Sequence, residues 1–317
     1  MTKILLPNDD ALEMACDILK NDGLTAIPTE TVYGLAANAF SEKAVRKIFE
    51  VKNRPPDNPL ITHISNMDML GLLARRIPHI ALVLAERFWP GPLTLILPKS
   101  KKVPQGTTAD LDSVAVRFPC NEIAVKLIEK CAFPLAAPSA NLSGSPSPTK
   151  AAHVYDDLKG KIPLIIDGGD CLHGVESTVV LPLEGERISI LRPGAITQEE
   201  LSAHAIITNG EFSSNEKPIS PGQKYKHYSP NAKVFLVVTD DSQKFKAYCH
   251  REYQSGDLIL TYGGTPVEQA RNLFSKLREC DTAGAKRVFV HSPEKHGIGL
   301  AVFNRLQKAA EKTVYLE

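Results

Sequence analysis

The sequence predicts an α/β protein in which a large mixed sheet, flanked by helices, precedes a smaller α/β domain. Over the first two-thirds of the chain, short apolar runs rich in β-branched residues alternate with runs whose apolar residues have helical spacing. Several strand-like runs follow one another without an intervening helix, which favours a mixed sheet. From residue 207 to residue 232 the composition changes to Asn, Gly, Ser, Pro, Lys and Tyr, as is typical of a linker. We therefore expect a first domain at 1–206, a linker at 207–232 and a second domain at 233–317.

The first domain is expected to hold about eight strands in one large twisted sheet, with helices covering it. The strand-like runs lie at 24–28, 60–64, 93–97, 114–118, 135–137, 164–166, 178–181 and 188–191. Amphipathic helices are predicted at 11–19, 44–51, 77–88 and 123–131. The helix at 44–51 must end before Pro55, Pro56 and Pro59, because proline cannot continue a helix.

The second domain is expected to be small and Rossmann-like, with parallel strands. Strand-like runs at 234–238, 258–261 and 288–290 alternate with helical runs at 242–253, 267–280 and 299–312. Gly297 and Gly299 lack the Gly-x-Gly-x-x-Gly spacing, so we expect no dinucleotide site there.

Composition excludes several classes of protein. Of the 317 residues, 43% are hydrophobic and 23% charged, and no apolar run reaches the length that spans a bilayer. The first residues lack a secretory signal, so we expect a cytoplasmic protein. The six cysteines are scattered singly without Cys-x-x-Cys pairs, so we expect reduced, mostly buried thiols and no metal ligands. A net charge of +1 argues against a surface coated by nucleic acid but allows a local basic cleft.

Several cations lie at the ends of predicted elements. Lys52, Arg54 and Asn58 fall on the proline-stiffened connection after the helix at 44–51, which fixes where their donors point. Arg117 and Arg192 lie in apolar company near the ends of strands. Each arginine is either in an internal ion pair, which is the commoner case, or reaches into a cleft for an anion. The Lys52 segment by itself is equally compatible with a solvated turn.

Two hydroxyl-rich loops follow predicted strands. In the loop at 28–35, Thr31 and Tyr33 could orient a small polar substrate, although a capped turn explains the same residues. In the loop at 137–149, small side chains allow backbone amides to approach a phosphate, and a flexible surface loop is the alternative. Hydrolase, P-loop and zincin motifs are absent, and taken alone His63 is more typical of a strand histidine than of a catalyst.

Taken together, these motifs resemble the YrdC-type family of threonylcarbamoyl-adenylate synthases. The resemblance rests on Pro-Thr-Glu-Thr-Val-Tyr-Gly-Leu at 28–35, Lys-x-Arg at 52–54 and Ser-x-Asn at 139–141. Pro-Gly-Pro-Leu-Thr at 90–94, Glu-Ser-Thr at 176–178 and Arg-Pro-Gly at 192–194 extend it. The motif at 220–230 is similar to the linker of the family's long form, and Asn-Arg-Leu at 304–306 to its last helix.

The resemblance implies an ATP-dependent nucleotidyltransferase, an L-threonylcarbamoyladenylate synthase. Such enzymes join L-threonine, bicarbonate and ATP, with Mg²⁺ on the nucleotide, into threonylcarbamoyl-AMP and release pyrophosphate. This is the first step of tRNA threonylcarbamoyladenosine (t6A) formation. A downstream threonylcarbamoyl transferase then modifies certain tRNAs, so contact with tRNA is possible.

The family's site residues carry over onto matching positions of this chain. The resemblance implies that threonine is bound by Thr31, His63, Arg117, Ala137 and Ser177, with Arg117 pairing the carboxylate bidentately. It implies that ATP is bound by Arg54, Asn58, Ser113, Ser139, Asn141, Ser147, Arg192 and Tyr228. Lys52 and Arg54 are the expected catalytic cations, with Lys52 on the phosphates or the carbamate, and no protein metal ligand is expected. Tyr228 and the rest of 220–230 form either a lid over ATP or a passive tether.

Two other functions remain open at this point. Hydrogenase-maturation proteins contain a similar domain and make a carbamoyl adenylate, but they carry zinc-binding cysteine pairs that this sequence lacks. A double-stranded RNA or tRNA-binding module using the basic cleft is the alternative from another class. Its affinity for RNA would fall steeply with salt.

Overall fold

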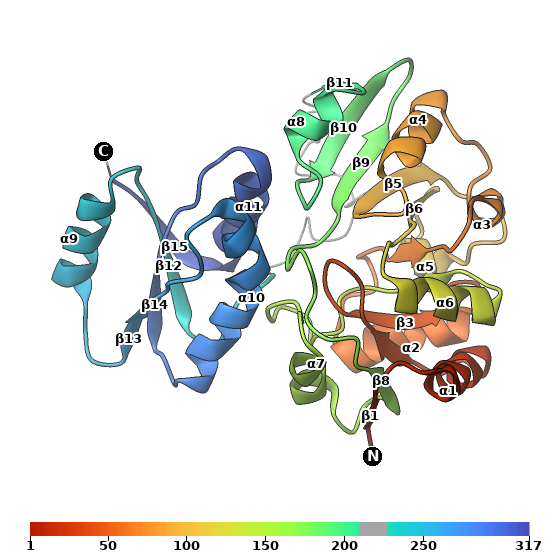
Figure 1. Ribbon diagram of the computed structural model, residues 1–317, viewed down its shortest axis with the longest axis horizontal. Helices are drawn as coiled ribbons and strands as arrows, with labels where there is room; N and C mark the ends of the chain where they lie inside the picture. The colour runs from red at the N-terminus through yellow and green to blue at the C-terminus, as the bar shows by residue number, and fades with distance from the viewer. Residues whose placement is uncertain (209–226, 317) are drawn as a thin grey trace.

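The computed structural model describes residues 1–208 and 227–316, which form an N-terminal and a C-terminal domain, each with its own sheet (Figure 1). Residues 209–226 and 317 lie outside the described residues. They include most of the predicted linker and the part of the predicted lid before His227.

One mixed sheet organises the N-terminal domain. Its strands are β1 (Lys3–Leu5), β2 (Thr25–Ile27), β3 (Gly34–Asn38), β4 (Ile61–His63), β5 (Leu93–Pro98), β6 (Ser113–Arg117), β7 (Leu135–Ala136), β8 (Leu164–Ile166), β9 (Thr178–Pro182), β10 (Arg187–Arg192) and β11 (Ile206–Ile207). Their order within the described sheet is β1-β8-β2-β3-β7-β4-β6-β5-β9-β10-β11. The β4–β6 and β5–β9 pairs are parallel, whereas β5–β6 and β9–β10 are antiparallel. The predicted large mixed sheet is confirmed.

Helices cover the sheet, and local sequence sets their ends. They are α1 (Asp9–Lys20), α2 (Glu42–Lys52), α3 (Met67–Leu73), α4 (His79–Phe88), α5 (Gln105–Thr108), α6 (Glu122–Cys131), α7 (Ala151–Leu158) and α8 (Gln198–Ser202). The side chain of Ser41 accepts a hydrogen bond from the Ala44 amide and so caps the start of α2. At its other end Asn53 adopts a left-handed conformation with φ of 50°, and Pro55 and Pro56 follow. The Lys52–Arg54 segment thus lies at a sharply terminated helix end.

Alternation along the strands divides the core between the two faces of the sheet. Ile27, Ala36 and Leu135 pack with the helices α1, α3, α4 and α6, while Ala26 and Leu35 pack with α2 and α7 on the opposite face. Side chains of adjacent strand residues therefore enter different layers, and both layers exclude water.

The C-terminal domain is a small sheet with helices on it. Its elements are β12 (Lys233–Val238), α9 (Ser242–Glu252), β13 (Asp257–Ile259), α10 (Pro266–Thr282), β14 (Arg287–His291), α11 (Gly297–Ala309) and β15 (Ala310–Tyr315). All pairs in its described order β13-β14-β12-β15 are parallel, as predicted. Figure 1 shows α10 and α11 on the side of this domain that faces the N-terminal domain. None of the described helices is both long and apolar enough to cross a membrane.

Four described strands were not predicted. Three of them, β1, β3 and β11, are short or lie where sequence analysis placed a loop, and pairing with neighbouring strands is what makes them strands. The fourth corrects a helix prediction. The helix expected at 299–312 ends at Ala309, and residues 310–315 continue directly as β15 beside β12. Glu311 and Lys312 suit an exposed helix as well as an exposed strand face, so composition alone did not separate them.

Candidate active site

A cavity opens where loops from several strands of the N-terminal sheet meet the start of the C-terminal domain. Its volume is about 700 Å³, open space at the mouth included. Its walls come from the loop after β2, the connection between α2 and β4, the ends of β4, β6 and β10, and the loop after β7. Loops at the ends of strands in such sheets are the usual place for a ligand.

Arg54 and Arg192 bring positive charge to this cavity. Arg54 Nη2 donates to the carbonyl oxygens of Asn58 (3.3 Å) and Pro59 (3.1 Å). Arg192 Nη2 donates to the carbonyl (2.8 Å) and the hydroxyl (3.1 Å) of Ser177. Burial lowers the pKa of Arg54 to about 10, which leaves the guanidinium charged at neutral pH. Within the described chain both arginines are held by neutral oxygen acceptors rather than by salt bridges, so their charge is available to an anion.

Arg117, at the end of β6, is held differently. Its Nη2 forms an ion pair with Glu30 Oε1 at 2.6 Å, and its Nη1 donates to the Thr31 hydroxyl at 2.9 Å. Burial alone would raise the pKa of Glu30, but the charge and hydrogen bond of Arg117 outweigh it and lower that pKa. The common expectation of internal pairing therefore applies to Arg117. The N–H groups left for a ligand are Nε and the second hydrogen of each terminal nitrogen.

His63 lies next to this ion pair, on β4 beside Arg117 on β6. Its side chain is buried, and its Nδ1 has no hydrogen-bond partner in the described structure. Burial and the positive charge of Arg117 lower the pKa of His63 to about 3. The ring is therefore neutral near pH 7 and presents an unused polar atom beside the cavity.

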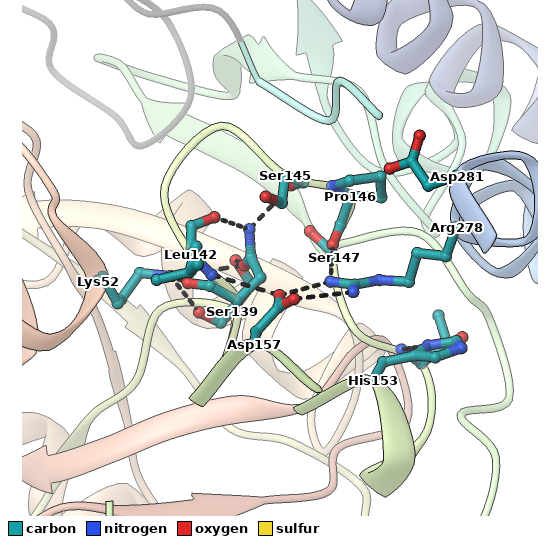
Figure 2. Close-up of polar contacts among 12 residues, drawn as sticks. Lys52, Ser139, Leu142, Ser145, Pro146, Ser147, His153, Asp157, Arg278 and Asp281 are labelled. Carbon is teal, nitrogen blue, oxygen red and sulfur yellow. Dashed lines mark hydrogen bonds and ion pairs between the residues drawn. The ribbon is translucent and has the colours of Figure 1, made fainter. Parts of the chain in front are cut away.

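Lys52, the last residue of α2, holds the loop after β7 in place, and Figure 2 shows its side chain reaching toward Ser139. Lys52 is 1% exposed, and its Nζ donates to the carbonyls of Ser139 (2.6 Å) and Asn141 and to Asn141 Oδ1 (3.5 Å). Burial, with the charge of Arg54 nearby, lowers the pKa of Lys52 well below its ordinary value. Three oxygen acceptors around one nitrogen nevertheless use all three N–H groups of the ammonium, so this geometry selects the protonated form.

The far wall of the cavity contains a buried carboxylate that connects the two domains. Glu176 Oε1 accepts a hydrogen bond from Ser147 Oγ at 2.7 Å, and Glu176 Oε2 accepts one from Arg305 Nε of α11 at 2.8 Å. Burial alone would raise the pKa of Glu176, but Arg305 and Arg192 lower it. Tyr228 closes the same wall, with its ring stacked on Phe274 of α10 at 5.3 Å between centroids.

Most of the predicted site residues meet at this cavity. Those that line it are Thr31, Arg54, His63, Arg117, Ala137, Ser139, Asn141, Ser147, Ser177, Arg192 and Tyr228. Asn58 is buried behind Arg54, with both amide atoms unpartnered in the described structure. Lys52 also lies behind the wall, in contact with the loop rather than with the cavity.

Two residues considered in the sequence analysis lie away from the cavity. Ser113 does not line the cavity, because it begins β6 opposite Pro98, at the other end of the strand from Arg117. Tyr33, for which substrate contact and a capped turn were both considered, is fully buried, and its hydroxyl donates to the Gly169 carbonyl at 2.8 Å. Thr31 to Tyr33 precede β3 in an irregular segment, and the ring of Tyr33 lies in the core formed with α2 and α7.

Sequence analysis missed the residues that hold the others in place. Glu30, Glu176, Arg278 and Arg305 form buried or half-buried ion pairs around the cavity, and His227 lines it beside Tyr228. Glu30, Glu176 and Arg305 did stand inside recognised motifs, at 28–35, 176–178 and 304–306. No set of three or more His, Cys, Asp or Glu side chains within the described residues could enclose a metal ion.

Comparison with known proteins gives the relatives of this chain. Residues 17–194 match the Sua5, YciO and YrdC family model, whose description is telomere recombination, and residues 196–311 match a model described as the C-terminal domain of threonylcarbamoyl-AMP synthase. The threonylcarbamoyl-AMP synthase of Pyrococcus abyssi is 45% identical, over 94% of both chains. That of Bacillus subtilis is 42% identical over 98% of this chain and 96% of the relative. The crystal structure of P. abyssi Sua5 complexed with L-threonine is 42% identical and superposes with a TM-score of 0.90, covering 100% of this chain and 99% of that chain.

Proposed function

The chain belongs to the Sua5, YciO and YrdC family, in the form that carries the C-terminal domain of threonylcarbamoyl-AMP synthase, and from this we propose that it makes L-threonylcarbamoyladenylate. In the proposed reaction the amine of L-threonine combines with bicarbonate, losing water, to give a carbamate. A carbamate oxygen then bonds to the α-phosphorus of ATP, and the bond to pyrophosphate breaks. The reacting species are anions, so catalysis depends on positioning and on neutralising charge.

The observation that carries this proposal is the state of Arg54 and Arg192. Both are cavity-lining guanidiniums that donate to carbonyl or hydroxyl oxygens, and in the described chain neither forms a direct salt bridge with a carboxylate, although the charges of Asp57 and Glu176 act on them from a distance. A buried charge of this kind is costly unless an anion compensates it. We assign the α- to γ-phosphates of ATP to this pair, because planar guanidiniums match phosphate oxygens bidentately.

The nucleotide site also includes the loop after β7. Ser139, Asn141 and Ser147 line the cavity, and their small side chains allow backbone N–H groups to approach phosphate oxygens. Lys52 acts on this loop through the carbonyls it binds, so we assign it to positioning rather than to direct contact with the phosphates. Asn58, which supplies a carbonyl to Arg54, is assigned to orienting that arginine. Ser113 is not part of the proposed site.

The threonine site is proposed at the opposite side of the cavity, around Thr31, His63 and Arg117. Arg117 supplies positive charge for the amino-acid carboxylate through the N–H groups not used by Glu30 and Thr31. Neutral His63 offers a hydrogen bond without adding a second cation. Ala137 and Ser177 complete the walls. The hydroxyl, imidazole and guanidinium groups that line this side suit a small amino acid beside a nucleotide.

Magnesium enters as part of the substrate, on the phosphates of ATP. The described residues offer no cluster of carboxylates for a resident ion, and the cavity carboxylate Glu176 is already occupied by Ser147 and Arg305. Mg²⁺ commonly relies on substrate phosphates and water for most of its ligands.

The lid and the downstream transfer to tRNA are assigned from the family resemblance. Tyr228 and the segment at 220–230, which lies mainly outside the described residues, are proposed to close over ATP and exclude water from a hydrolysable product. The adenylate then passes to a separate transferase that modifies tRNA. Contact between this chain and tRNA is not required for the proposed reaction. We place the reaction in the cytoplasm, consistent with six free cysteines, of which five are buried.

Pyrophosphate release by the purified full chain tests the proposal. We expect release from MgATP only when both L-threonine and bicarbonate are present, with no RNA added and with serine as a control substrate. Arg54→Ala should fold but release no pyrophosphate above background. Release that ignores threonine or bicarbonate, or full activity in Arg54→Ala, would overturn the assignment. RNA binding without pyrophosphate release would favour the RNA-binding alternative.

A further inference from the structure

The C-terminal domain contacts the back of the loop after β7, at the points where that loop approaches the proposed nucleotide site. Figure 2 shows Arg278 reaching from this domain toward Asp157 and Pro146. Arg278 Nη1 donates to Asp157 Oδ1 at 3.0 Å, and Nη2 donates to Asp157 Oδ2 at 2.7 Å and to the Pro146 carbonyl at 2.5 Å. Both side chains are mostly buried, with 14% of Arg278 and 13% of Asp157 exposed. A two-pronged pair of this kind fixes orientation as well as distance.

Asp157 links Arg278 to a second point of the loop. Its Oδ2 also accepts a hydrogen bond from the Leu142 amide at 3.3 Å. Next to it, the side-chain Nδ2 of Asn141 donates to the carbonyls of Leu142 (2.7 Å) and Ser145 (2.8 Å). Lys52 holds the same loop from the other side. The loop is therefore held between a lysine of the N-terminal domain and an arginine of the C-terminal domain.

A second arginine of the C-terminal domain holds the neighbouring residue. Arg305 is fully buried, and it binds Glu176, which in turn accepts the hydrogen bond of Ser147. Pro146 and Ser147 are thus anchored by two different helices of one domain, α10 through Arg278 and α11 through Arg305. Neither arginine lines the cavity, so both reach a ligand through residues that do, among them Asn141, Ser147 and Glu176.

We propose that Arg278 is a positioning residue for the nucleotide site, and that docking of the C-terminal domain sets the loop at 141–147 in its ATP-binding geometry. This inference rests on the proposed function for the identity of the nucleotide. The threonine side of the cavity, around Thr31 and Arg117, is held within the N-terminal domain by Glu30 and does not depend on Arg278. The inference therefore requires a selective effect on ATP.

The test compares variants of the full chain in two assays, binding of MgATP and of L-threonine by calorimetry, and steady-state pyrophosphate release. Arg278→Ala should weaken ATP binding and raise KM for ATP by about 10- to 100-fold, because small displacements of positioning groups have effects of that size. Threonine affinity should change by less than about twofold. Arg278→Lys should behave like Arg278→Ala, since an ammonium cannot replace the planar fork.

Asp157→Asn provides a milder variant that keeps the Pro146 contact, and it should raise KM for ATP in the same direction. The double variant Arg278→Ala/Asp157→Ala should weaken ATP binding by less than the sum of the single variants Arg278→Ala and Asp157→Ala, because both changes break the Arg278–Asp157 pair. Arg271→Ala is the matched control. Arg271 lies on the same helix and donates to the Leu172 carbonyl of the N-terminal domain at 3.1 Å, but it has no described contact with the loop at 141–147.

The outcomes distinguish the positioning role of Arg278 from the proposed synthase function. Equal ATP affinity in Arg278→Ala and Arg271→Ala would overturn the positioning role. So would an equal weakening of ATP and threonine binding, which would show general loss of structure. A wild-type chain that binds MgATP but forms no pyrophosphate would contradict the proposed function alone, and the ATP-binding comparison would still decide the role of Arg278.

Discussion

Acidification should destabilise the N-terminal domain through His63, a buried residue of the proposed threonine site. In the folded protein, burial and the charge of Arg117 lower the pKa of His63 to about 3, from an ordinary value of 6.5. The neutral ring is favoured in the native state, so the stability it contributes is present above pH 6.5 and is lost as the pH falls toward 3. The perturbation is a change from about pH 7.5 to about pH 5, in the wild type and in His63→Gln.

The magnitude follows from proton binding to the unfolded chain. A pH of about 5 lies about 1.5 units below the pKa of an unfolded histidine, so that histidine is protonated. Folded His63 is still neutral at this pH. At about 1.4 kcal/mol per unit, this stabilises the unfolded state by about 2 kcal/mol, and the contribution at pH 7.5 is close to zero. His63→Gln removes this contribution. The difference in unfolding free energy between wild type and variant should therefore change by about 2 kcal/mol between the two pH values.

Urea unfolding of the ligand-free protein, followed by tryptophan fluorescence, measures this difference. Trp89 is the single tryptophan of the chain and is buried in the core of the N-terminal domain, so its emission reports on the domain that contains His63. With a slope of about 2 kcal/mol per molar urea, the expected change corresponds to about 1 M in the difference between midpoints. His79→Gln, a change at an exposed histidine, controls for the substitution. A difference between wild type and His63→Gln that stays constant within about 0.5 kcal/mol at both pH values would refute the reasoning.

Three further changes have defined expectations. Lys52→Met should lower MgATP affinity by about 10- to 100-fold in calorimetry while threonine affinity stays the same, because only the loop after β7 loses its support; unchanged ATP affinity would contradict this role. Gly194→Ala would place a Cβ 2.4 Å from the Ser177 backbone, so we expect the free energy of unfolding in urea to fall by about 1–3 kcal/mol and threonine to bind more weakly. An unchanged free energy of unfolding would be inconsistent with this packing. Arg305→Ala leaves the Glu176 carboxylate without its main partner and should cost about 3–5 kcal/mol, whereas adding Glu176→Gln should restore much of that stability; no recovery in the double variant would argue against the pair.

The features that sequence analysis predicted are those that local pattern determines. The strand at Ile61–His63, the helix end at Lys52 and the loop after β7 follow from apolar periodicity, prolines and small polar residues within short windows. Their convergence on one cavity follows from the family resemblance, because nothing local relates Lys52 to Asn141, which lies 89 residues away.

Partners distant in sequence account for what sequence analysis missed. Arg117 could be recognised as a cation that needs a partner, but its pairing with Glu30 depends on how β6 lies relative to the loop after β2. Arg278 on an amphipathic helix has the pattern of a solvated cation, and only domain docking brings it to Asp157. Ser113 was named from the family resemblance alone, and in the structure it lies at the opposite end of an extended strand from Arg117.

The identity of the nucleotide product tests the central claim most directly. The full chain would be incubated with MgATP, L-threonine and ¹³C-bicarbonate, and the adenylate product analysed by mass spectrometry. The account predicts an adenylate that contains both threonine and the ¹³C label, because the carbamate carbon comes from bicarbonate. A threonyl adenylate without the label, or AMP as the only product, would contradict it.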